Sequence, residues 1–178
     1  LALLKEMGAV MVDVTVRHAE LASPASAVIR GSECAAFHEK RLRENAGLFD
    51  PLVRERLEAN GFYSATDYIK ALRVRTMLIE EMRRVFRACD VLMLPAGNPA
   101  PKLTDEIAGT DVPPDPPPPP RPDTLNLANM TGIPAIVLPC GFTAGSPVLP
   151  LGIQFCAKAF DEAMLFRVAH AYQTATNW

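Results

Sequence analysis

Histidine is scarce in this sequence, and its cysteines are never closely paired. The three histidines do not fall in an HExxH or similar spacing, and the four cysteines include no CxxC pair. These absences predict neither a zinc site nor a dense disulfide framework, so we expect no metal and no cofactor. Single cysteines among apolar residues favour a reducing compartment, which we expect to be the cytoplasm.

A strong charge of one sign and long hydrophobic runs are also missing. The net charge is −2, which argues against the basic surface that nucleic-acid binding requires. The longest apolar runs, such as residues 91–94 and 133–139, are far shorter than the roughly 20 residues that cross a bilayer. We therefore expect no nucleic-acid partner and no membrane partner.

Helical and strand patterns alternate along the chain. Helices are predicted to begin near Ser23, Asp50 and Ser64, which are residue types that cap helix N-termini. Apolar runs or two-residue alternation predict strands, and helical spacing predicts the end of a helix before Gly8, a short helix before Gly132 and a closing helix. The expected strands cover residues 10–16, 90–94, 134–139 and 150–157, and the closing helix covers residues 161–174. This alternation predicts an α/β fold with a mixed β-sheet covered by helices on both faces.

Proline is concentrated in one stretch of the chain. Residues 95–123 hold most of the 17 prolines, including a run of five from Pro116 to Pro120. Such a segment cannot donate hydrogen bonds to a sheet, so we predict an exposed loop within a single domain of residues 1–178. A second interpretation is a noncatalytic interaction module that binds a partner through this Pro-rich loop.

Motifs for nucleophilic catalysis are absent. Neither a GxSxG turn nor an SxxK motif occurs, and adjacent acidic pairs are typical of solvated surface charge. Cys34 and His38 are one helical turn apart, but a buried cysteine and a surface histidine explain that spacing. A thiol hydrolase that uses Cys34 or Cys140 would lack a base in a recognisable motif.

The carboxyl-terminal residues carry a specific pattern. NMTGIPAIVLPCGF, then LPLGIQ, then FDEAMLFRVA within residues 129–178 closely resemble the end of amidase signature enzymes. Upstream, DVLMLPAGNPAP and the stretch SATDYIKALRVRTMLIEEM resemble the strand and long helix that precede this pattern. The resemblance covers nearly the whole chain, and it implies the carboxyl-terminal part of an amidase signature fold.

The resemblance implies a hydrolase that breaks carboxamide C–N bonds. Family members use a serine nucleophile, a second serine and a lysine, and their glycine- and serine-rich signature lies upstream of the region matched here. This sequence has no GGSS-like segment, so no catalytic residue is assigned and the chain alone is expected to be inactive. Its expected contribution is to complete the sheet and one wall of the substrate pocket.

Four residues are predicted to bind a small-molecule amide in the full-length enzyme. In related enzymes the segment before the N-x-T-G turn faces the substrate, which here implies Asp123, Asn126 and Leu127, with Asn129 at the turn. The alternative is that Asn126 and Asn129 only cap the short helix and the turn. Leu125 and Leu127 replace a threonine and a proline of the family pattern, and Ala96 and Gly97 replace a hydroxyl-bearing pair, which suggests an apolar or aryl amide.

The partner prediction follows from the strands. Their apolar patterns require neighbours that are not all in this sequence, and open sheet edges promote association. We therefore expect self-association or pairing with the amino-terminal part of an amidase.

Overall fold

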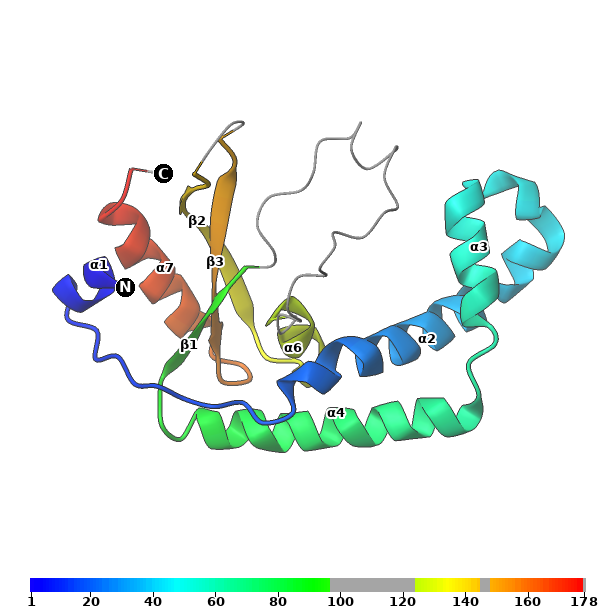
Figure 1. The fold of residues 1–178 in the computed structure, drawn as a ribbon, viewed down its shortest axis with the longest axis horizontal. Coiled ribbons are helices and arrows are strands. Elements are labelled where there is room, and N and C mark those ends of the chain that lie inside the picture. The colour runs from blue at the N-terminus through cyan, green and yellow to red at the C-terminus, as the bar shows by residue number, and fades with distance from the viewer. Residues whose placement is uncertain (97–123, 145–147, 178) are drawn as a thin grey trace.

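Helices flank a small sheet in the computed structural model, which describes residues 1–96, 124–144 and 148–177 (Figure 1). The Pro-rich loop predicted for residues 95–123 lies outside the described residues, apart from Pro95 and Ala96. No helix in the described part is long and apolar enough to cross a membrane. The helices are α1 (Ala2–Glu6), α2 (Ala22–Asn45), α3 (Pro51–Asn60), α4 (Ala65–Val85), α6 (Thr124–Thr131) and α7 (Glu162–Thr174), with 3₁₀ turns η1 (Ala19–Leu21) and η2 (Ala46–Leu48).

Three strands form the described part of the sheet. They are β1 (Val91–Pro95), β2 (Ala135–Phe142) and β3 (Pro150–Ala157), in the spatial order β1-β3-β2. Both pairs are antiparallel, and Leu92 lies opposite Cys156 while Met93 lies opposite Phe155. The last strand in the sequence is therefore the central one.

Helices cover both faces of this sheet, as predicted. On one face Leu92 and Cys156 join a buried cluster, the large core, with residues of α2, α4 and α6. On the other face Phe155 joins a second cluster, the small core, with residues of α1 and α7. Successive strand residues point to opposite faces, so neighbouring positions such as Phe155 and Cys156 belong to different cores.

One predicted strand is wrong. Residues 10–16 alternate valine with other residues, but they form neither helix nor strand and connect α1 to η1 and α2. Val10 is 88% exposed and Val12 is 52% exposed. A strand forms only when a neighbouring strand accepts its backbone hydrogen bonds, and the described residues supply none at this position.

The helix starts show which local signals are sufficient. The prediction of a cap at Ser23 is wrong, because α2 begins at Ala22 after Leu21, which makes no side-chain capping bond. Ser64 caps α4 as predicted, since its Oγ accepts from the Asp67 N–H at 3.1 Å and donates to the Asp67 carboxylate at 2.7 Å. These contacts with Ser64 lower the pKa of Asp67. Gly132 ends α6 with a φ of 69°, a conformation that favours glycine.

Asp50 is the cap whose removal should be easiest to measure. Its carboxylate accepts from the N–H groups of Leu52 at 3.0 Å and Val53 at 3.3 Å at the start of α3. Asp50→Ala is expected to lower the free energy of unfolding by about 1 kcal/mol in urea titrations. Asp50→Asn keeps an acceptor and should retain most of that stability. Equal losses in both variants would contradict a capping role.

Candidate functional site

Helix α6 carries the residues predicted to face a substrate. Leu127 is 3% exposed and belongs to the large core, whereas Asn126 is half-buried and Asn129 is exposed. Asp123, the fourth predicted residue, lies outside the described residues. Successive positions of α6 therefore face different surroundings, and the described residues of the predicted set do not converge on one point.

Three contacts hold α6 in place. The hydroxyl of Ser26, on α2, donates to Asn126 Oδ1 at 3.1 Å. Arg75 on α4 donates from Nε to the Met130 carbonyl at 2.9 Å, and the buried Thr131 hydroxyl donates to the Leu127 carbonyl at 2.7 Å. Hydrogen bonds from two neighbouring helices fix both the rotation and the end of α6.

Ser26 was not predicted as part of this site. It is 7% exposed, and its hydrogen bond to Asn126 joins residues 100 positions apart in the sequence. Nothing local marks such a pair, because its geometry depends on how α2 packs against α6. Its position near the start of α2 gave only the interpretation of a helix start.

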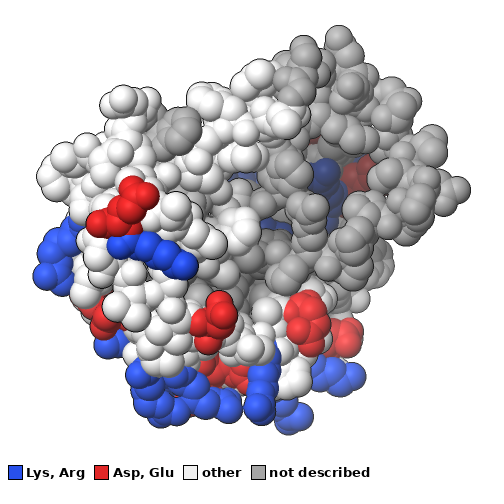
Figure 2. Space-filling view, turned by 60° about the vertical axis from the view of Figure 1, so that its left-hand side comes forward, with Lys and Arg blue, Asp and Glu red and all other residues white. Residues whose placement is uncertain are grey.

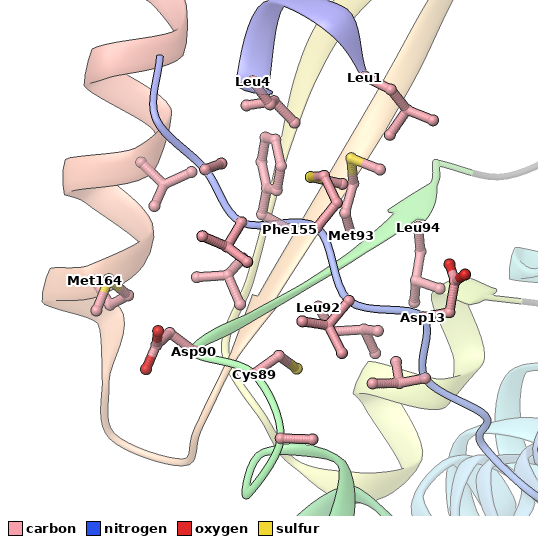
Figure 3. A pocket seen from close by; sticks show the side chains of 18 of the residues that line it. Leu1, Leu4, Asp13, Cys89, Asp90, Leu92, Met93, Leu94, Phe155 and Met164 are labelled. Carbon is pink, nitrogen blue, oxygen red and sulfur yellow. The ribbon is translucent and has the colours of Figure 1, made fainter. Parts of the chain in front are cut away.

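A large apolar cavity, which we call the groove, lies beside β1. It has a volume of about 1340 Å³ and is lined by residues of α1, the 8–16 segment, β1 and α7 (Figure 3). Leu127 and Phe155 also line it, whereas Asn126 and Asn129 do not. Of the predicted site residues in the described part, the structure therefore places only Leu127 at this cavity.

The surface that contains this side of the molecule is unevenly charged. Figure 2 shows lysine, arginine, aspartate and glutamate gathered along the lower part of that face, with a largely uncharged area above them. Interspersed charges of both signs give no extended basic surface in this view.

Thiols near the sheet are not activated. Burial raises the pKa of Cys89, which lines the groove, and burial also raises the pKa of Cys156 against a smaller opposing effect of Gln154. The Gln154 side-chain amide donates to the Cys156 sulfur at 3.2 Å. A raised pKa keeps a thiol protonated at neutral pH, and a protonated thiol is a weak nucleophile.

Other polar groups in the described ranges give no assembled reaction centre. The Ser32 hydroxyl and His38 Nδ1 are buried without a hydrogen-bond partner, and the His38 ring lies edge-on to Phe37 and Phe49. Among residues 1–96, 124–144 and 148–177, no group of three or more histidine, cysteine or acidic residues is placed to hold a metal ion.

Comparison with known proteins gives consistent matches. The family model described as Amidase matches residues 1–166. The chain is 33% identical over 180 residues to an amidase of Pseudomonas putida, with 98% of this chain and 37% of the relative covered. It is 31% identical over 205 residues to a glutamyl-tRNA(Gln) amidotransferase subunit from Cupriavidus metallidurans, with 100% of this chain and 39% of the relative covered.

Solved structures match the same fold. The crystal structure of an amidase superposes with a TM-score of 0.77 at 24% sequence identity, over 98% of this chain and 39% of that one. This likeness confirms the predicted fold class of helices packed around a sheet. The chain thus spans less than half the length of these relatives. Since the family model covers almost all of the sequence, the chain belongs to the amidase family.

Proposed function

We propose that this chain is the carboxyl-terminal part of an amide hydrolase whose serine nucleophile lies outside the chain. The match of the Amidase model to residues 1–166 is the observation that supports this function most directly. The reaction would cleave the C–N bond of a small carboxamide, and it would need no metal or cofactor from this chain. The chain alone would be inactive, because none of its serines lies in a GGSS-like segment.

The proposed role of the chain is to complete the sheet and one wall of the substrate pocket. Asp123, Asn126, Leu127 and Asn129 would contribute to that wall. The hydrogen bond from Ser26 supports a positioning role for α2, because it fixes the Asn126 amide relative to the helix. Leu125 is 41% exposed beside these residues, which supports an apolar or aryl amide as the substrate.

The working environment and the rival function follow from other observations. All four cysteines are free, which supports a reducing compartment such as the cytoplasm. The rival interaction module depends on the Pro-rich loop, which is almost entirely outside the described residues. No observation on the described residues favours that rival.

Substrate discrimination tests the proposed function. The 178-residue chain would be co-expressed with the part of the P. putida amidase outside the matched segment, and kcat/KM would be measured for acetamide and acetanilide. We expect hydrolysis by the assembled protein and none by the chain alone. Asn126→Leu should change the ratio of the two kcat/KM values by about 10- to 100-fold, because it removes a polar contact worth about 1–3 kcal/mol in discrimination.

Gly132→Ala provides the matched control. Its φ of 69° strains any side chain, so this variant should lower the melting temperature and leave the ratio of the two kcat/KM values unchanged. If Asn126→Leu lowers both kcat/KM values in equal proportion while its melting temperature falls, Asn126 is structural. If the assembled protein hydrolyses neither amide, the proposed function is wrong.

A further inference from the structure

The outer edge of β1 has backbone donors without partners in the described part of the chain. The Ala96 N–H donates to the Gly152 carbonyl at 3.0 Å, and these residues continue the register in which Leu94 lies opposite Gln154. Hydrogen-bonded pairs alternate along an antiparallel ladder, so Leu94 and Leu92 also bond to β3. The N–H groups of Val91 and Met93 consequently point away from β3.

Pro95 fits this alternation. It occupies the next position after Met93 that faces the outer edge, opposite Ile153 in the register. A proline there removes no hydrogen bond to β3, because its missing N–H would have pointed outward. The register thus leaves two outward N–H groups on β1, at Val91 and Met93.

The groove lies against this edge. Its walls include Leu92, Met93 and Leu94 on one side and Val10, Met11 and Val12 on the other. Its volume of about 1340 Å³ exceeds the roughly 300–1,000 Å³ that small-molecule sites usually occupy. An apolar space of this size beside unpaired backbone donors has the properties of a place for a polypeptide strand.

The opposite wall also lacks backbone partners. Residues 10–16 have the two-residue alternation of a strand but make no backbone hydrogen bond in the described part of the chain. The exposure of Val10 and Val12 leaves apolar side chains without cover beside the groove. A strand between β1 and this segment would cover them and bring backbone groups within reach of residues 10–16.

We propose that the groove accepts one apolar β-strand from the part of an amidase that this chain does not cover, paired to β1 through the N–H groups of Val91 and Met93. This inference rests on the proposed function. The occupant is assigned to that part because the relatives extend well beyond the matched segment, which makes up 37–39% of their length. A strand that continues an existing sheet satisfies the edge donors and covers the apolar walls together.

Hydrogen exchange tests the pairing directly. The 178-residue chain would be mixed with the part of the P. putida amidase outside the matched segment, and residue-resolved exchange of the Val91 and Met93 amides would be followed by mass spectrometry. We expect exchange at both amides to slow at least 100-fold in the complex. The groove thiol of Cys89 should also become less reactive to alkylation, whereas Cys34 on α2 should not change.

Two variants separate backbone pairing from apolar contact. Met93→Pro removes an outward N–H without removing a donor to β3, and it should weaken capture of the amidase part at least tenfold. Met93→Leu keeps the donor and a similar side-chain volume, so capture should be unchanged. If Met93→Pro fails to fold, the exchange measurement on the unsubstituted chain still decides the matter.

The outcomes distinguish this inference from the proposed function. Protected amides in a complex that hydrolyses no amide would support the groove and refute the function. A complex in which Val91 and Met93 exchange as in the free chain, or no complex at all, would overturn the groove. Protection that appears in the chain alone as its concentration rises would assign the groove to a second copy and overturn the occupant.

Discussion

Replacing Phe155 by alanine should lower the free energy of unfolding by about 3–5 kcal/mol, which is much of the stability of an ordinary domain. Phe155 lies on the central strand and is 2% exposed. Its ring lies edge-on to Tyr172 of α7, with 6.1 Å between the ring centroids. Truncation would remove this contact and leave a cavity between β3 and α7, where the backbone cannot collapse easily.

The matched control is Phe166→Ala, which makes the same chemical change on α7. Phe166 is 65% exposed, so its loss should change the free energy of unfolding by about 0.5 kcal/mol or less. Urea unfolding followed by circular dichroism measures both variants. Similar losses at the two positions would show that α7 is not packed on β3 as described.

Leu78→Ala should cost about 2–5 kcal/mol through the large core. Leu78 is fully buried in the second half of α4 and belongs to the same cluster as Leu92 and Leu127. The loss combines the transfer free energy of the removed methyl groups with the cavity that they leave. Helix propensity partly offsets this cost, because alanine is the best helix former.

Leu52→Ala is the control for Leu78→Ala. Leu52 lies on α3 and is 67% exposed, so the expected change in the free energy of unfolding is about 0.5 kcal/mol or less. Thermal and urea unfolding of the pair give the comparison. A loss at Leu52 as large as that at Leu78 would indicate that α3 is buried in an assembly.

Sequence reasoning succeeded where a structure depends on near neighbours. The caps at Asp50 and Ser64 bind N–H groups two or three residues away, so the sequence contains both partners. The stop at Gly132 is equally local, since it depends on the φ of one residue. Helices α3, α4 and α6 were therefore predictable in position.

Features that depend on distant partners were less accessible. Residues 10–16 have a strand pattern, yet a strand also requires an adjacent backbone, which no pattern within the segment specifies. The bond from Ser26 to Asn126 depends on the packing of α2 against α6. The assignment of Asp123, Asn126, Leu127 and Asn129 to a substrate wall stays a prediction.

The order of strands in the sheet has a consequence for synthesis on the ribosome. β3 is the last strand to be translated, and both β1 and β2 bond to it. A growing chain therefore exposes two unpaired strands until residues 150–157 emerge, while helices α2, α3 and α4 are already complete. Because domains tend to fold from the amino terminus as they are made, the helices precede the sheet, and a nascent chain stalled before Pro150 is the form most exposed to chaperones.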